Sequence, residues 1–457
     1  MPLRVKVLSR NPSDYLRETK DDIFKVPRNY SGDVHPFQEE REYVRALNST
    51  KLERVFAKPF LASLDGHTDG VGCLCKHPRR LSLLLSGSYD GQVKLWNLPR
   101  KECLATVQAH SGFVRGMAVD PTTGDGEASS FVTVGDDQLI KRWAIPEELV
   151  ADSELAEPVH SIICKSQVLD VSHHWKRSQF ATCGEGVDVW DHTRNSPVRT
   201  FQWGVDSLTK VSYNPIETEL LLSCCADRGI YLYDTREQNP LRKVTLKLRS
   251  NAVCWNPMEA YIFTAANEDY NLYTFDVRHL KSAVNCHMDH TEAVMCVDYA
   301  PTGRELVSGS YDKSVRIFPV DKGRSREIYH TRRMHRVMAV SWSMDNKFVL
   351  SGSDEMNIRL WKANASEKLG TLRPRERQAK AYSEKLKEKF GQHPELRRIS
   401  RHRHVPKHIY NARKEHAVIR ASKKRKQSNL RLHCTPKEER DKKPPAERAK
   451  HVVREDY

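Results

Sequence analysis

Short apolar stretches alternate with polar turns along most of this chain, and seven of the stretches share one local pattern. Small or hydroxyl residues come first, an acidic residue follows, and an alternating apolar segment then ends on an aromatic residue, as in SGSYDGQVKLWN and SGSYDKSVRIFP. Alternation with a period of two predicts β-strands that bury one face. The closing aromatic residues recur every 42 to 47 positions and are Trp96, Trp143, Trp190, Tyr233, Phe275, Phe318 and Trp361. A repeat of this length is typical of a four-stranded blade, so the chain is predicted to be an all-β protein with a seven-bladed propeller.

The segment before the first repeat predicts how the ring closes. Residues 55–64 read VFAKPFLASL and precede Gly66-His67, where the first repeat begins. We expect this segment to supply the outer strand of the blade that ends at Trp361, because a ring closed by both ends of the chain leaves no exposed main edge. The propeller is therefore assigned to residues 54–362.

The first two repeats carry residues suited to a buried polar network. In such a network a turn carboxylate orients an imidazole, which reaches a strand hydroxyl and the indole N–H and so locks neighbouring strands together. The sixth repeat ends in Phe318, which has no N–H, and Arg333 stands where the seventh repeat would have its histidine. Because these residues recur with the blade period, we interpret them as structural. They are His67, Asp90 and Trp96 in the first repeat and His110, Asp137 and Trp143 in the second.

Both ends of the chain lack the strand pattern. Residues 1–53 combine four prolines with nearly balanced charges and no sustained helix or strand period, which predicts an extended N-terminal arm. A helix is predicted from Pro374 to Phe390, with an apolar stripe that either packs on the tail or the propeller rim or docks another protein. The ending, residues 434–457, is rich in proline and charge and is predicted to be disordered.

Charge separates the propeller from the C-terminal part of the chain. The 96 residues after Trp361 hold 29 Lys and Arg against 12 Asp and Glu, a net charge of +17, whereas the whole chain carries +16. Since phosphate polymers attract Lys and Arg whatever their sequence, the partly helical basic region of residues 363–433 is predicted to contact nucleic acid. The alternative is a solvated charged surface. The candidate nucleic-acid-binding residues are Arg397, Arg398, Arg401, Arg403, Lys407, Arg413, Lys414, Lys423, Lys424, Arg425 and Lys426.

The sequence offers no grouping that would indicate an enzyme. A nucleophile with its base, a phosphate-binding glycine loop and metal-ligand spacing are all missing outside the periodic positions, so we expect no cofactor, no metal and no small-molecule substrate. The 11 cysteines form no CxxC pair, which indicates reduced thiols. His402, His404, His408 and Cys434 match no zinc module. Since no apolar run approaches the ~18 residues that a span requires, no membrane association is expected.

Several sequence segments near the two ends resemble one particular family among the WD-repeat proteins. They include KVLSRNPSDYLRETKDD, REYVRALNSTKLERVFAKPFLASLDGH and LKEKFGQHPELRRISRHRHVPKHIY, and they resemble the WD-repeat and SOF-domain proteins. That resemblance implies a non-catalytic scaffold of the small-subunit processome in 18S pre-rRNA processing and 40S ribosome biogenesis, located in the nucleus and nucleolus. It implies that the basic residues named above bind RNA and target the nucleolus, with pre-ribosomal RNA, the U3 small nucleolar ribonucleoprotein and other processome proteins as partners. It also implies an alternative or additional role as substrate receptor of a cullin-4 E3 ubiquitin ligase.

The receptor role would use the pattern Trp-Asp-x-Arg at blade ends to bind the ligase adaptor. Here Asp234 with Arg236 and Asp276 with Arg278 carry the pattern, but the tryptophan of the pattern is replaced by Tyr233 and Phe275. The third blade has one residue too many, as WDHTR. These residues are either an adaptor site or ordinary blade termini whose aspartates cap turns.

Overall fold

The chain forms two compact units in the computed structural model, which describes residues 37–122, 129–146, 153–154, 157–203, 206–434 and 451–456. The helical unit combines the part up to Pro59 with Asn364–His404. The propeller unit combines Phe60–Ala363 with the part from Val405 onward.

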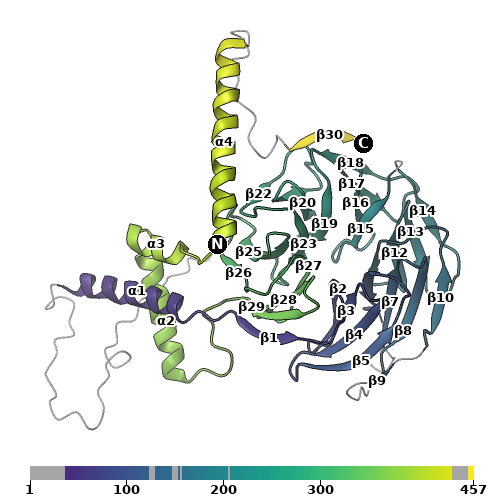
Figure 1. Cartoon of the computed structure of the whole chain (residues 1–457), viewed down its shortest axis with the longest axis horizontal. Coiled ribbons are helices and arrows are strands. Elements are labelled where there is room, and N and C mark those ends of the chain that lie inside the picture. The colour runs from purple at the N-terminus through teal and green to yellow at the C-terminus, as the bar shows by residue number, and fades with distance from the viewer. Residues whose placement is uncertain are drawn as a thin grey trace, which may run out of the picture. The chain divides into compact units, whose positions relative to one another are not determined.

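Seven mainly antiparallel sheets form the ring of the propeller unit and confirm the predicted fold (Figure 1). The first strands of neighbouring blades lie beside one another all the way around the ring. Blade one contains β2 (Val71–Lys76), β3 (Leu83–Ser88), β4 (Gln92–Asn97) and β5 (Glu102–Gln108). Blade two contains β6 (Val114–Val119), β7 (Ser130–Gly135), β8 (Leu139–Ala144) and β10 (His160–Ile163). Blade three contains β11 (Asp170–His173), β12 (Gln179–Cys183), β13 (Val187–Asp191) and β14 (Arg199–Phe201). The short β9 (Ser153–Glu154) pairs with β5 in parallel.

The remaining four blades repeat this order. Blades four and five contain β15 (Leu208–Tyr213), β16 (Leu220–Cys225), β17 (Gly229–Asp234) and β18 (Arg242–Leu246); β19 (Ser250–Trp255), β20 (Ile262–Asn267), β21 (Asn271–Asp276) and β22 (Asn285–Met288). Blades six and seven contain β23 (Val294–Tyr299), β24 (Glu305–Ser310), β25 (Val315–Pro319) and β26 (Glu327–Tyr329); β27 (Val337–Trp342), β28 (Phe348–Ser353), β29 (Ile358–Lys362) and β1 (Phe60–Leu64).

Blade seven is built from both ends of the propeller sequence, as predicted. β1 pairs antiparallel with β29, and the register places Phe60 opposite Trp361 and Leu64 opposite Ile358. The strand begins at Phe60, five residues later than the predicted segment, because Val55 still belongs to a helix. This pairing gives the outer face of β29 a partner and closes the ring.

The seven closing aromatic residues lie in the core between the blades, where none is more than 4% exposed. Each aromatic side chain buries a large apolar area, and Phe131 and Trp143 additionally stack at 6.3 Å between ring centroids. The periodic aromatic pattern therefore marks packing positions.

The helical unit contains α1 (Gln38–Val55), α2 (Pro374–Lys389) and α3 (Pro394–Arg401). The predicted helix from Pro374 is confirmed, and its apolar stripe packs within the unit: Tyr382 and Leu386 bury against Ala46 of α1 and Leu396 of α3. Ion pairs from Lys387 and Lys389 to acidic residues of α1 surround this core. Of the two roles predicted for the stripe, the structure favours packing against the chain's own helices.

The predicted extended arm is wrong for the residues of α1. Residues 38–53 are helical, whereas residues 1–36 lie outside the described part of the chain. The helix has few apolar residues of its own, so local pattern does not reveal it. Its stability comes from burying one face against α2 and α3, which is how most helices are stabilised in proteins.

The predicted disorder of the last residues is also wrong in one place. β30 (Val452–Asp456) pairs antiparallel with β18 and becomes a fifth strand of blade four. A nearby imidazole, that of His451, contacts Asp269 at 3.3 Å. An edge strand offers unpaired main-chain groups to any extended segment, so a charged sequence can be ordered there without a large apolar core. Residues 435–450 lie outside the described part.

Among the described helices, none combines the length and the apolar character that a bilayer crossing requires.

Leu386→Ala should lower the free energy of unfolding of the helical unit by about 2–5 kcal/mol, because Leu386 is 1% exposed in the centre of the core of that unit. Hydrogen exchange of the full chain should show faster exchange of amides in α1 as well as α2. Leu369→Ala in the same unit, where the side chain is 42% exposed, is the control and should change little. Unchanged exchange in α1 would contradict the packing described for this unit.

Candidate protein and nucleic-acid interfaces

The predicted blade network is present in the second blade. The Nδ1–H of His110 donates to Asp137 Oδ1 at 2.8 Å, and its Nε2 lies 3.0 Å from the hydroxyl of Thr133. The indole N–H of Trp143 donates to the same hydroxyl at 3.1 Å. Because this chain of hydrogen bonds joins β7 and β8 to the loop before β6, these residues hold the blade together.

The first blade differs from the prediction at its carboxylate. His67 Nε2 and the indole N–H of Trp96 both reach Ser86 Oγ at 2.7 Å, but His67 Nδ1 is 4.0 Å from Asp90. Asp90 instead accepts hydrogen bonds from the hydroxyl and main-chain N–H of Thr68. Burial lowers the pKa of His67 to about 4, against the attraction of Asp90, so the ring is neutral at pH 7.

The two candidate adaptor pairs form matching forks on neighbouring blades. Asp234, the last residue of β17, accepts hydrogen bonds from the main-chain N–H of Arg236 at 2.9 Å and from its guanidinium at 2.7 Å. Asp276, the last residue of β21, accepts from the same two groups of Arg278 at 2.9 and 2.8 Å. Both carboxylates are mostly buried, whereas the arginine side chains are 67% and 64% exposed.

Electrostatics keep both aspartates ionised. Burial raises the pKa of Asp234, but the hydrogen bonds and charge of Arg236 outweigh that effect and lower it. The hydrogen bond from Arg278 is the largest influence on the pKa of Asp276 and lowers it, against a smaller effect of burial. Each fork therefore holds a fixed guanidinium at the surface, with part of its donor edge free for a carboxylate or carbonyl of a partner.

The aromatic residue before each fork does not face a partner. Tyr233 and Phe275 are fully buried, and the hydroxyl of Tyr233 lies 3.2 Å from Ser223 Oγ within the blade. Replacing Trp by another aromatic residue at these two places alters the core of the blade and leaves the exposed pair in position. The turn after β13 is different, since Asp191 there accepts from the N–H and hydroxyl of Thr193 at 3.1 Å.

The predicted basic region is divided between the two units. In the helical unit, Arg397, Arg398 and Arg401 of α3 are exposed. Arg403 is half-buried, and its guanidinium donates to the carbonyl oxygen of Ser400 at 2.6 Å, near the end of α3. Three of these four arginines thus have exposed side chains for contact with phosphate, while Arg403 also holds the chain at the end of a helix.

In the propeller unit the remaining candidates lie on α4 (Lys407–Cys434), a helix of 28 residues. Ile409 near its start is fully buried. Arg413 pairs with Asp289 at 3.2 Å, and the ring of His416 stacks on that of Tyr270 at 5.2 Å. The start of α4 is therefore fixed on blades five and six, and Arg413 has a structural contact that the sequence did not predict.

Besides Arg413, the candidate cations of α4 are exposed to solvent. The exposed candidates on this helix are Lys407, Lys414, Lys423, Lys424, Arg425 and Lys426. Because consecutive helical residues point in directions about 100° apart, the run of four covers the whole circumference of the helix. Such a helix can attract a phosphate backbone from several sides.

A polar hollow of about 150 Å³ lies between the start of α4 and the propeller. Three arginines and one aspartate line it, which makes it positive overall. Its lining residues are Met288, Asp289, His290, Thr291, Arg324, Arg413, His416, Ala417 and Arg420. Sequence reasoning missed Arg324, because that residue precedes β26 inside the propeller and carries no local signal that joins it to a helix almost a hundred positions later.

Comparisons with known proteins give the chain two matching domains and a set of close relatives. The Sof1-like domain matches residues 363–452, and the WD domain, G-beta repeat, matches residues 58–97, 281–318 and 326–362. Proteins named DDB1- and CUL4-associated factor 13 are 57% identical in Xenopus laevis over 99% of both chains, and 56% identical in Homo sapiens over 95% of this chain and 96% of that one. The Dictyostelium discoideum protein of this name is 45% identical over 94% and 95%.

Among solved structures, the WD40 β-propeller domain of Doa1 is similar at a TM-score of 0.55 and 17% identity, over 66% of this chain and 96% of that one. This likeness supports the propeller fold alone.

Acidification from pH 7 to pH 5 should destabilise the propeller through its buried neutral histidines, His67 among them. A histidine whose folded pKa is about 4 binds fewer protons than the unfolded chain, with a pKa near 6.5. The contribution of neutral His67 to the free energy of unfolding is therefore fully present above about pH 6.5. It is lost as the pH falls toward about 4, at up to ~1.4 kcal/mol per pH unit. We expect His67→Asn to flatten the decline of the unfolding temperature between pH 7 and 5. The exposed His335→Asn is the control, and equal pH slopes in both variants would contradict this assignment.

Proposed function

This chain belongs to the DDB1- and CUL4-associated factor 13 family, and on that premise we propose that it is a non-catalytic receptor whose propeller binds the DDB1 adaptor of a cullin-4 ubiquitin ligase. The names of its relatives support the proposal, since DDB1 and CUL4 are the proteins with which those names associate them. The observation that carries it is the pair of matching Asp–Arg forks on blades four and five.

The forks suit protein binding for three reasons. In each fork the aspartate ends the third strand of its blade and the arginine lies in the turn that follows, so the ring places both forks on the same face. Each guanidinium is oriented before binding, which lowers the entropy that an interface loses on ordering a long side chain. Arg278 also lies 5.0 Å from the ring centroid of Tyr261, so an arginine and an aromatic residue stand together at the surface. Both residue types are frequent among those that dominate binding energy.

Arg236→Ala combined with Arg278→Ala should weaken binding to purified DDB1 by at least tenfold, because truncation of such anchors commonly costs more than 1 kcal/mol. The affinity of the full chain can be measured by interferometry. Arg194→Ala, in the third-blade turn that lacks the fork, is the matched control and should bind as the unaltered chain does. Unchanged affinity of the double variant, with its unfolding temperature preserved, would remove these arginines from the adaptor site.

We propose as a second function that the chain is a scaffold of the small-subunit processome, where its basic segments bind precursor ribosomal RNA beside the U3 small nucleolar ribonucleoprotein in the nucleolus. The support is the Sof1-like domain together with the exposed cations of α3 and α4. The hollow lined by Arg324, Arg413 and Arg420 adds a second, shaped positive surface. Receptor and scaffold roles use different parts of the chain, so one protein can perform both.

The division of charge supports contact with a polyanion. The net charge of the residues after Trp361 is +17, while the whole chain carries +16. Neutralising phosphates releases counterions, so affinity would come mainly from this segment and would depend strongly on salt. The propeller, nearly neutral, would contribute positioning through the fixed start of α4.

Replacing Lys423, Lys424, Arg425 and Lys426 by Ala should reduce the affinity for a labelled precursor-rRNA fragment. The slope of log affinity against log salt should fall by about 0.7–0.9 for each phosphate that the variant no longer neutralises. Electrophoretic mobility shifts of the full chain at several salt concentrations provide the measurement.

The matched control removes four exposed cations elsewhere on the propeller: Arg100, Lys165, Lys176 and Lys281. Its affinity and salt slope should remain near those of the unaltered chain. Equal losses in the two variants would indicate that net charge alone, and not the helix α4, determines binding to RNA.

A further inference from the structure

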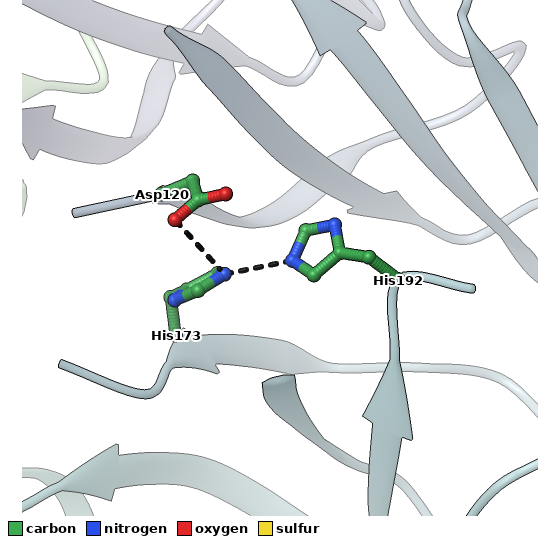
Figure 2. A group of neighbouring side chains, drawn as sticks. All are labelled: Asp120, His173 and His192. Atoms are coloured by element: carbon green, nitrogen blue, oxygen red, sulfur yellow. Dashed lines mark hydrogen bonds and ion pairs between the residues drawn. The ribbon is translucent and has the colours of Figure 1, made fainter. Parts of the chain in front are cut away.

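Three metal-ligating side chains from two neighbouring blades converge at one point in the propeller (Figure 2). Asp120 follows β6 of blade two, His173 ends β11 of blade three, and His192 follows β13 of the same blade. The Nε2 atoms of His173 and His192 are 2.8 Å apart, and Asp120 Oδ1 is 3.5 Å from the Nε2 of His173. Within the described residues, no other group of three His, Cys, Asp or Glu side chains brings its ligand atoms this close.

The protonation states direct lone pairs into this cluster. His173 Nδ1–H donates to the carbonyl oxygen of His174 at 2.7 Å, which leaves Nε2 of the neutral ring without a proton. Burial lowers the pKa of His173, against the attraction of Asp120, and lowers that of His192 to about 4. Burial raises the pKa of Asp120, but the effects that lower it, of which the hydrogen bond from the Thr122 hydroxyl is the largest, outweigh burial, so the carboxylate is ionised.

Hydrogen bonding does not account fully for the cluster. One Nε2–H between the two imidazoles satisfies that pair, but the Asp120 oxygen then faces the lone pair of His173 Nε2 at 3.5 Å. The 2.8 Å contact holds the proton of the His192 ring on Nε2, and its Nδ1 is buried without a hydrogen-bond partner. With that proton on Nδ1, two imidazole nitrogens and one carboxylate oxygen all present lone pairs to the same point.

We propose that Asp120, His173 and His192 bind a divalent transition-metal ion of the zinc type, which links blades two and three. Two imidazoles and one carboxylate are a common ligand set for Zn²⁺, with the fourth position left to water. A tetrahedral ion requires the two Nε2 atoms to separate from 2.8 to about 3.3 Å, a small movement for side chains at strand ends.

The surroundings hold the ligands in the way that metal sites do. A metal-bound histidine usually donates its other N–H to a carbonyl or carboxylate, and His173 does so to His174. Asp120 Oδ1 accepts from the N–H and hydroxyl of Thr122 at 2.8 and 2.6 Å, which fixes the carboxylate. The charge of Arg142 acts on both histidines and opposes a cation, while the ionised Asp120 favours it.

The proposal also accounts for the departure of the third blade from the Asp-x-Arg pattern. Its turn reads Asp191-His192-Thr193-Arg194, with one residue more than the turns of blades four and five. His192 of this longer turn is the residue that contacts His173. The site is thus on the same face of the ring as the two forks, and it gives that turn a role other than presenting an arginine.

The test uses the full chain without a polyhistidine tag, treated with a chelator and then titrated with Zn²⁺. We expect one equivalent of Zn²⁺ to bind with micromolar or tighter affinity by calorimetry, and the unfolding temperature to rise with Zn²⁺ concentration. Co²⁺ in place of Zn²⁺ should give the visible absorption bands of a four-coordinate site. Absence of binding at micromolar Zn²⁺, or of any Zn²⁺-dependent rise in the unfolding temperature, would overturn the proposal.

Variants separate this site from adventitious binding. His192→Gln and His173→Gln should each lose the bound equivalent, the cobalt bands and the Zn²⁺-dependent rise in unfolding temperature. The exposed His335→Gln is the matched control and should retain all three. Should a variant fail to fold without metal, Asp120→Asn, which keeps the shape of the side chain, provides the same comparison. Equal Zn²⁺ binding by the variants and the control would show that the ion binds elsewhere. These measurements involve neither DDB1 nor RNA, so they stand or fall apart from the proposed functions.

Discussion

The pairing of β1 with β29 is the contact on which the propeller depends. The four principal strands of each of the other six blades come from one stretch of chain, whereas blade seven needs its outer strand from the opposite end of the propeller sequence. Without that strand, β29 would expose a row of unpaired main-chain groups, and blade seven would lose the strand that joins it through the chain to blade one. The same contact also explains the helical unit. Because Phe60 lies opposite Trp361, the segments before and after the propeller leave it from one blade, and α1 and α2 can share a core.

The sequence predicted the periodic features well, because the same residue pattern occurs in every repeat. Seven closing aromatic residues, the alternating strands and the closing strand all follow from local pattern, and the helix from Pro374 begins with proline as a helix start should. The blade network of His110 was also predictable, since its spacing repeats. In the first blade Asp90 accepts from Thr68 rather than from His67, a local competition between two donors for one carboxylate that spacing alone does not decide.

The features that the sequence did not predict depend on partners distant in the chain. The helix α1 has a polar sequence and is stabilised by α2 and α3, while β30 is ordered by the free edge of β18. The start of α4 is fixed by Asp289 and Tyr270 of the propeller. The cluster of Asp120, His173 and His192 joins three strand ends from two blades, and no sequence spacing identifies it. In each case tertiary contact decides the outcome.

Closure of the ring by β1 has a consequence for how the protein is made. Leu64 pairs with Ile358, so about 300 residues must leave the ribosome after β1 before its partner strand exists. At typical synthesis rates of about 5–20 residues per second, β1 waits for tens of seconds as an unpaired apolar segment. Blades one to six can form during that time from local contacts, whereas blade seven forms across the largest separation of any described strand pair. A chain interrupted before β29 therefore carries a nearly complete propeller with two open edges, a form suited to capture by chaperones or to pairing with another such chain.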